Sequence, residues 1–183
     1  MCQSGTIAEF IMTDFVSPTM SNETIQYEPI GRIHSPFESV DGMPIQSAAA
    51  TDVTGRVELD AAYADGLDDL DGFSHCILLY HFDRATEAAS LAVRPFLDDE
   101  RRGLFATRAP QRPNPIGLSV VEIDGRDGST LAISGVDVLD GTPLLDVKPY
   151  VPQFDAHSDA KTGWLEETPA TADDVAADSR FRQ

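Results

Sequence analysis

The chain has 183 residues, enough for one domain with its own hydrophobic core and too few for two large ones. Its 31 acidic residues outnumber 13 lysines and arginines, which gives a formal net charge of −18. Two cysteines exclude a disulfide framework, no apolar run is long enough to span a membrane, and no basic segment precedes an apolar one at the N-terminus. These features favour a reducing, cytoplasmic location without membrane contact.

The acidic excess is spread along the whole chain, and only Lys148 and Lys161 are lysines. Strong screening in a high-salt cytoplasm makes such self-repulsion tolerable, and carboxylates there hold water and cations. The composition therefore favours a halophilic protein over an ordinary acidic one.

The chain divides by composition into three parts. Residues 1–25 carry no sustained hydrophobic period, so we expect a disordered or loosely packed N-terminal extension. One ordered domain is expected over residues 26–167. Residues 168–183 are rich in Ala, Asp and Thr, and we predict a C-terminal tail.

Most of the expected domain consists of short apolar or alternating segments, which are typical of β-strands. Alanines and leucines at helical spacing predict one short helix over 61–70, and 37–54 reads as a long loop. The predicted strands, in chain order, cover residues 25–34, 56–59, 73–82, 103–107, 117–123, 130–138 and 144–150.

Asp-Gly pairs at 124–125, 127–128 and 140–141 predict turns between the later strands, because glycine tolerates the positive φ that such turns need. Strands spaced this closely favour an antiparallel barrel or sandwich over βαβ units. The chain also lacks the glycine-rich phosphate loop of doubly wound folds.

The densest motif is a proline-rich loop between two predicted strands. Pro110, Pro113 and Pro115 fix φ and remove backbone donors, so the loop is stiff and suited to holding a ligand-binding arginine. Neighbouring arginines would bind an anionic partner, such as a carboxylate or an RNA phosphate, or would pair with the carboxylates at 98–100; spacing alone leaves both open. Five of the eleven arginines lie in this region: Arg94, Arg101, Arg102, Arg108 and Arg112.

A second motif covers residues 136–150, where Asp140-Gly141-Thr142-Pro143 forms a turn by its chemistry. Asp137 and Asp146 lie within apolar strands, where carboxylates are rarely buried without a partner. Lys148 or a nearby arginine is the natural partner, which would make these carboxylates structural.

The histidines give no metal site. His75 and His81 lie six residues apart on one apolar strand and point to the same face, but no third ligand is near in sequence. A structural role is favoured over metal binding. No nucleophile elbow or paired-cysteine motif is present, and no catalytic residue can be assigned.

Four segments in the same order resemble the TsaA-like family, whose characterised members are tRNA methyltransferases of the TrmO type. The resemblance covers about residues 27–155. It implies a small, non-Rossmann, antiparallel β-barrel with one or two short helices, which forms a homodimer and binds S-adenosyl-L-methionine near the subunit interface. The segments are IGRIHSPF (30–37), FSHCILLYHFDR (73–84), ATRAPQRPNPIGLS (106–119) and LDGTPLLDVKPYVP (139–152).

The resemblance also implies N6-methylation of the threonylcarbamoyl-adenosine beside the anticodon of threonine tRNA. Asp83 or Asp140 would hold the amine of the cofactor's methionine moiety, and Arg108 its carboxylate. Ile45 stands where some relatives have an arginine, so any contact there would be apolar or through the backbone. The cofactor-binding positions carried over are Ile45, Gln46, Ser47, Phe82, Asp83, Arg108, Leu118, Asp140, Gly141, Thr142 and Pro143.

Two other functions stay open at the level of sequence. One is a methyltransferase of the same fold that acts on another nucleoside or on a small molecule. The other is a non-catalytic barrel that binds RNA or the cofactor.

Overall fold

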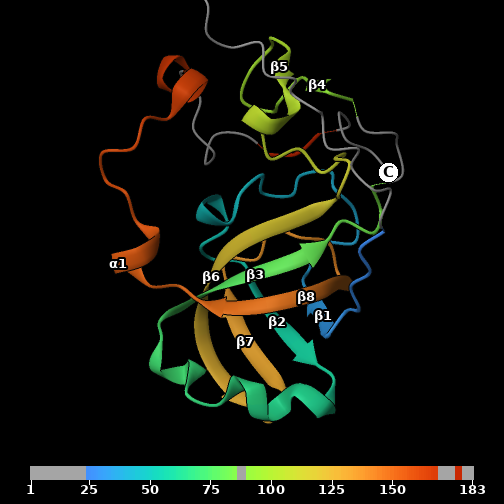
Figure 1. The fold of residues 1–183 in the computed structure, drawn as a ribbon, viewed down its shortest axis with the longest axis vertical. Coiled ribbons are helices and arrows are strands. Elements are labelled where there is room, and N and C mark those ends of the chain that lie inside the picture. The colour runs from blue at the N-terminus through green and yellow to red at the C-terminus, as the bar shows by residue number, and fades with distance from the viewer. Residues whose placement is uncertain (1–23, 86–89, 169–175, 179–183) are drawn as a thin grey trace, which may run out of the picture.

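A computed structural model describes residues 24–85, 90–168 and 176–178. Six antiparallel strands close into a barrel in the order β1-β2-β7-β6-β3-β8 (Figure 1). Closure pairs every strand on both sides and leaves no open edge. The predicted antiparallel barrel is therefore confirmed. The strands are β1 (Gly31–His34), β2 (Thr54–Leu59), β3 (His75–His81), β6 (Ile116–Asp127), β7 (Thr130–Ser134) and β8 (Thr142–Pro149).

Strand β3 shows why these residues form a barrel. Cys76, Leu78 and Tyr80 are buried and alternate with residues that are only partly buried, as a pleated strand with one face on the core requires. His75 and His81 share the other face, as their spacing predicts. The same alternation on neighbouring strands fills the barrel with Ile33, Val57, Leu59, Val121, Leu131, Ile133 and Leu144.

Two short 3₁₀ helices, η2 (Ala61–Leu67) and η3 (Leu70–Gly72), close one end of the barrel. They place Leu67 and Leu70 in the core. The prediction of one helix over 61–70 was wrong because Asp69 adopts a left-handed conformation with φ of 66°, which a continuing right-handed helix does not allow.

A small lobe lies at the other end of the barrel in Figure 1. It consists of a hairpin of β4 (Ala92–Val93) and β5 (Arg102–Gly103) with the 3₁₀ turn η4 (Leu104–Ala106). Val93, Leu104 and Ala109 form its separate core, with Phe96 packed against them. The strand predicted over 103–107 was wrong, because the chain turns at η4 to bury Leu104 in this lobe.

Two later boundaries also differ from prediction. Strand β6 continues through Asp124-Gly125, where the pairing with β7 shifts register, so the turn predicted there was wrong. Strand β7 ends at Ser134 because Gly135 has φ of 90°, and residues 135–138 are a loop rather than a strand. The turn at Asp127-Gly128 does join β6 to β7, and Gly128 has φ of 58°.

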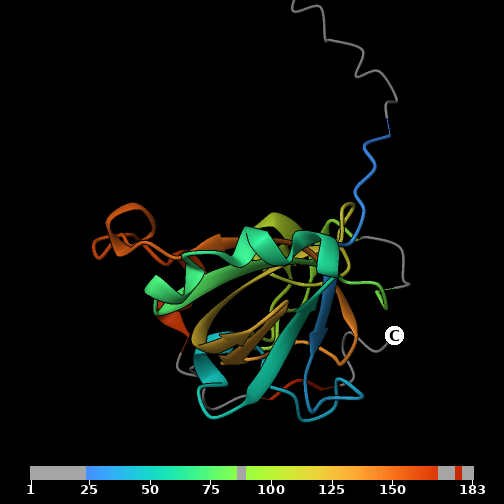
Figure 2. The ribbon, with the colours of Figure 1, turned by 90° about the horizontal axis from the view of Figure 1, so that it is seen from below.

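The two ends of the described chain behave differently. Before β1, residues 24–29 are exposed and lead away from the barrel (Figure 2), so the first strand is shorter than the predicted 25–34. The rest of the expected N-terminal extension lies outside the described residues. No helix in the described part of the chain combines the length and the apolar character that a membrane span requires.

After β8 the chain forms α1 (Pro152–Asp155) and η5 (Gly163–Glu167), and then returns to the barrel. Part of the stretch that we expected to be a tail pairs with the long loop. The Ala177 amide donates to the Met43 carbonyl over 2.8 Å, and the Gly42 amide donates to the Ala177 carbonyl over 3.0 Å. The long loop itself contains η1 (Ser47–Ala49).

Candidate functional site

A cavity of about 990 Å³ lies between the barrel and the small lobe. Its walls come from the long loop, the end of β3, the proline-rich loop, the start of β6, the loop after β7 and the segment around η5. This volume is at the upper end of the usual range for small-molecule sites. The most apolar strand and both sequence motifs thus meet at one place.

The proline-rich loop is held by its own arginine. Arg112 Nη1 donates to the Thr107 carbonyl over 2.9 Å, and its guanidinium lies 5.7 Å from the centre of the Phe105 ring. Arg108 reaches across the cavity, where its Nη1 donates to Gln46 Oε1 over 2.8 Å. Stiffening by proline and by Arg112 therefore presents Arg108 at a fixed position.

The other arginines of the cluster include one that pairs with the neighbouring carboxylates. Arg102 pairs with Asp98 over 2.6 Å and with Glu100 over 3.3 Å, so it is structural. Arg94 and Arg101 line a smaller cleft of about 490 Å³ beside the main cavity. The same cleft is also lined by Asp99, so it carries both positive and negative side chains.

A chain of polar groups runs from the barrel interior into the cavity. Tyr80 Oη lies 3.0 Å from Ser119 Oγ, and Ser119 Oγ donates to Asp137 Oδ1 over 2.5 Å. The Ser47 amide also donates to the Asp137 carboxylate. Burial raises the pKa of Asp137 to about 6 in spite of these hydrogen bonds.

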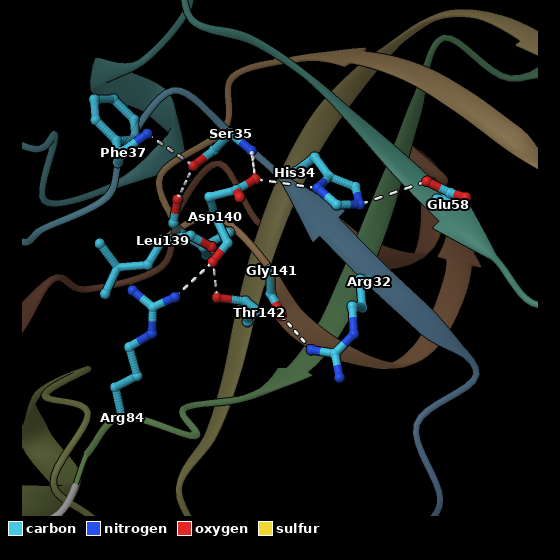
Figure 3. A network of polar contacts seen from close by, with 11 residues as sticks. Arg32, His34, Ser35, Phe37, Glu58, Arg84, Leu139, Asp140, Gly141 and Thr142 are labelled. Atoms are coloured by element: carbon cyan, nitrogen blue, oxygen red, sulfur yellow. Dashed lines mark hydrogen bonds and ion pairs between the residues drawn. The ribbon is translucent and has the colours of Figure 1, made fainter.

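The Asp140-Gly141-Thr142-Pro143 turn is fixed by hydrogen bonds on several sides (Figure 3). Asp140 Oδ1 lies 3.1 Å from His34 Nδ1 and accepts from the Ser35 amide over 3.2 Å. Arg84 Nη2 donates to the Asp140 carbonyl over 2.8 Å, and Arg32 Nη1 donates to the Gly141 carbonyl over 2.8 Å. Partial burial alone would raise the pKa of Asp140, but the Ser35 and His34 hydrogen bonds hold it below its usual value.

Most of the positions carried over from the resemblance meet at the cavity. Of the two carboxylates considered for the cofactor amine, Asp83 lines it, whereas Asp140 faces His34 and Ser35 instead. Ser47, Gly141 and Pro143 do not line the cavity. The positions that line the cavity are Ile45, Gln46, Phe82, Asp83, Arg108, Leu118 and Thr142.

Sequence reasoning missed three features of the site. Tyr80 was read only as part of an apolar strand, and Asp137 as a structural carboxylate. Trp164 of η5 was given no role, yet it lines the cavity and its Nε1 donates to the Ala106 carbonyl over 2.8 Å. The signal for the first two was a carboxylate in an apolar run, which requires a polar partner inside the barrel.

An apolar rim surrounds part of the cavity mouth. It consists of Phe105, Ile116, Leu118 and Leu165, which all line the cavity and expose between 41% and 75% of their surface. Large exposed apolar groups gathered at one place usually mark a binding surface. Among the described residues, no three metal-ligating side chains gather into a possible metal site.

Comparison with known proteins connects this geometry to a family. A family model described as the tRNA-methyltransferase O N-terminal domain matches residues 32–156. A probable S-adenosyl-L-methionine-binding protein of Pyrococcus abyssi is 51% identical over 157 residues, which cover 86% of this chain and 85% of that protein. The tRNA (adenine(37)-N6)-methyltransferase of Escherichia coli is 36% identical over 156 residues, which cover 80% of this chain and 66% of that protein.

Solved structures agree with the sequence matches. The crystal structure of TrmO from Pseudomonas aeruginosa is 40% identical, with a TM-score of 0.66 over 78% of this chain and 63% of that one. The chain therefore spans less than two thirds of that solved protein. The matches over most of its length show that the chain belongs to the TrmO family of tRNA methyltransferases, whose N-terminal domain it matches.

Proposed function

We propose that this protein transfers the methyl group of S-adenosyl-L-methionine to N6 of threonylcarbamoyl-adenosine beside the anticodon of threonine tRNA. The observation that carries the proposal is the cavity in which Arg108, Asp83 and apolar side chains converge, in a chain of the TrmO family. Relatives in Escherichia coli and Homo sapiens are named tRNA (adenine(37)-N6)-methyltransferase.

The residues at the cavity fit this cofactor. Arg108 offers a planar pair of donors for the carboxylate of the methionine moiety, and Asp83 offers an acceptor for its amine. Phe82 and Leu118 supply apolar surface of the kind that packs against an adenine ring. When bound, the cofactor supplies a methyl group on a positively charged sulfur.

The protein's own task is to position the reactants. Transfer of a methyl group from sulfur to nitrogen requires the two reacting centres in line and shielded from water, and it requires no protein nucleophile. The stiff loop, the Arg112 contacts and the fixed 140–143 turn hold the walls in place before the ligands arrive. Such preorganisation reduces the ordering that binding must impose.

The tRNA would approach the open mouth of the cavity. Arg94 and Arg101 line a second cleft together with Asp99, and phosphates of an anticodon loop would meet these two arginines on an otherwise acidic protein. We place this reaction in the cytoplasm, at high salt, as the composition suggests.

The protein is proposed to act as a homodimer. The rim of Phe105, Ile116, Leu118 and Leu165 would be covered by a second copy, which would supply a further wall for the cavity. Light scattering at assay concentration would then give a dimer. An active monomer would contradict this arrangement.

Nucleoside mass spectrometry of tRNA from a strain that lacks the gene tests the proposal. We expect threonylcarbamoyl-adenosine to lose its methyl group in that strain and to regain it when the gene is restored. Loss of a methyl group from another nucleoside would favour the first alternative enzyme. Unchanged tRNA would favour a non-catalytic barrel, and co-purified S-adenosyl-L-methionine would then separate a cofactor-binding barrel from one that binds RNA alone.

A further inference from the structure

The polar chain of Tyr80, Ser119 and Asp137 is unusual in its surroundings. Tyr80 is 3% exposed and Ser119 is 2% exposed, and Thr142 is the other polar residue recorded as buried among the described residues. Tyr80 and Asp137 both line the cavity, so the chain connects the barrel interior with the site. A carboxylate held in such a place is a candidate for chemistry, because its burial alone is unfavourable.

The direction of the hydrogen bonds is fixed by the hydroxyl groups. Ser119 has one hydroxyl proton and donates it to Asp137, so it must accept its second hydrogen bond from Tyr80. Burial raises the pKa of Tyr80 above its ordinary value, so the phenol keeps its proton. The chain therefore directs donors toward the carboxylate and holds it in one orientation.

The charged surroundings allow this carboxylate to take up a proton. Arg108 acts on it from the proline-rich loop and Tyr80 from β3, while Asp83, Arg84 and Arg112 line the same cavity. A carboxylate accepts about four hydrogen bonds, and donors from Ser119, the Ser47 amide and its own amide use three of them. Its pKa of about 6 leaves it ionised at neutral pH and close to the working range of a general base.

We propose that Asp137 accepts the proton that leaves the methylated nitrogen, and that Ser119 and Tyr80 position its carboxylate for this step. This inference rests on the proposed function, because it concerns the same cavity and the same reaction.

The N–H bond breaks, its proton passes to the Asp137 carboxylate, and its electron pair stays on the nitrogen. The nitrogen forms the new bond to the methyl carbon, and the methyl–sulfur bond breaks with its electron pair going to sulfur. Protonated Asp137 then releases the proton to water. An exocyclic nitrogen whose lone pair is delocalised into the purine ring, and into a carbonyl group if it carries one, is a weak nucleophile until its proton is removed.

The test compares single-turnover methyl transfer by the wild-type protein and Asp137→Asn at saturating cofactor and tRNA, across a range of pH. The wild-type rate should rise with pH through an apparent pKa near 6 and then level off. Asp137→Asn should be slower by about 10²- to 10⁴-fold, without this rise, and should bind S-adenosyl-L-methionine with an unchanged Kd by calorimetry. Asp83→Asn is the matched control, which should weaken cofactor binding and keep the pH-dependent rise.

Several outcomes would overturn the proposal. Asp137→Asn that retains the wild-type rate or its pH profile would exclude proton acceptance, and a defect confined to the Kd would make Asp137 a cofactor ligand. A wild-type protein that transfers no methyl group to tRNA would overturn the proposed function first.

The positioning roles of Tyr80 and Ser119 are tested separately, by the pH dependence of the rate. Ser119→Ala removes a donor to the carboxylate, and Tyr80→Phe removes the donor that holds the Ser119 hydroxyl in place, so both should move the rise to higher pH. An unshifted profile in both would assign them a structural role only.

Discussion

Gly117 lies directly beneath the Tyr80 ring, its partner across the β3–β6 pair. A Cβ at this position would overlap the Tyr80 side chain. The glycine of the proline-rich motif thus makes room for the aromatic ring that begins the polar chain. From the sequence, Gly117 could be predicted only as the start of a strand. Its contact with the Tyr80 ring could not be predicted, because Tyr80 lies 37 positions earlier in the chain.

Arg108 is the side chain on which cofactor binding should depend most. Arg108→Ala is expected to weaken the affinity for S-adenosyl-L-methionine by about 2–5 kcal/mol, because a charge-assisted pair of hydrogen bonds is lost. Its partner in the free protein is the neutral Gln46, so the fold should survive. Calorimetry measures the affinity, and Arg126→Ala, which breaks an ion pair with Asp68 outside the cavity, is the control. Wild-type affinity in folded Arg108→Ala would refute the assignment.

Asp137 should also make the free energy of unfolding depend on pH. Its pKa of about 6 in the folded state exceeds the ~3.9 of an unfolded chain, so the folded state binds this proton more tightly. The resulting stabilisation is complete below about pH 4 and is lost as pH rises through about 6. The free energy of unfolding should therefore fall by about 2–3 kcal/mol over this window in the wild-type protein relative to Asp137→Asn. Urea denaturation at a series of pH values measures the free energy of unfolding of both proteins. If the difference in this free energy between wild type and Asp137→Asn did not change with pH, the raised pKa would be contradicted.

At the scale of elements, the strands of the barrel could be predicted from the sequence and the lobe could not. Alternating burial along β3 and the turn at Asp127-Gly128 are local patterns. The turn at η4 is not, because it depends on burying Leu104 against Val93 and Ala109. The same limit applies to Asp137, since the apolar Val136 and Val138 continue the strand pattern after Gly135 has ended β7.

The candidate site divides in the same way. Its two motif loops could be located from prolines, arginines and turn residues within short segments. The wall formed by η5 could not, because Trp164 is brought to the proline-rich loop only by the return of the chain after α1. The polar chain of Tyr80, Ser119 and Asp137 could not be predicted either, because its residues come from different segments whose pairing is known only from the structure.

The η5 element should contribute to ligand binding rather than to barrel stability. Trp164 contacts the site through its bond to the Ala106 carbonyl and through Arg102, which lies 5.7 Å from the centre of its ring. Trp164→Ala removes apolar surface from the cavity wall, and it also removes the contacts that hold this wall against the proline-rich loop. We expect cofactor affinity to fall by about tenfold or more while the urea midpoint changes little. Phe154→Ala, at an exposed position of α1, is the control. A large loss of stability with unchanged affinity would contradict this role.

At the scale of the whole molecule, the net charge of −18 opposes the binding of a polyanionic tRNA. Arg94 and Arg101 in the smaller cleft offset this repulsion only locally. At ~0.1 M salt the Debye length is about 10 Å, and at ~1 M it is about 3 Å, so the long-range repulsion disappears as salt rises. Direct arginine–phosphate contacts weaken as well, because fewer counterions are released.

We expect the relief of repulsion to dominate, so that tRNA affinity and fold stability both rise with KCl toward molar concentrations. Filter binding and thermal unfolding across a salt series measure the two quantities. A tRNA affinity that falls steadily from low salt upward, with the fold intact throughout, would contradict the halophilic interpretation.

The most direct test of the account is methyl transfer by the purified protein in vitro. Threonine tRNA that carries threonylcarbamoyl-adenosine is incubated with S-adenosyl-L-methionine at high KCl, and its nucleosides are separated and weighed by mass spectrometry. Matched tRNA that lacks the threonylcarbamoyl group is the control. The account predicts one added methyl group on N6 of the threonylcarbamoyl-adenosine and none in the control tRNA. A folded, cofactor-binding protein that leaves both tRNAs unmethylated, or that methylates both equally, would contradict it.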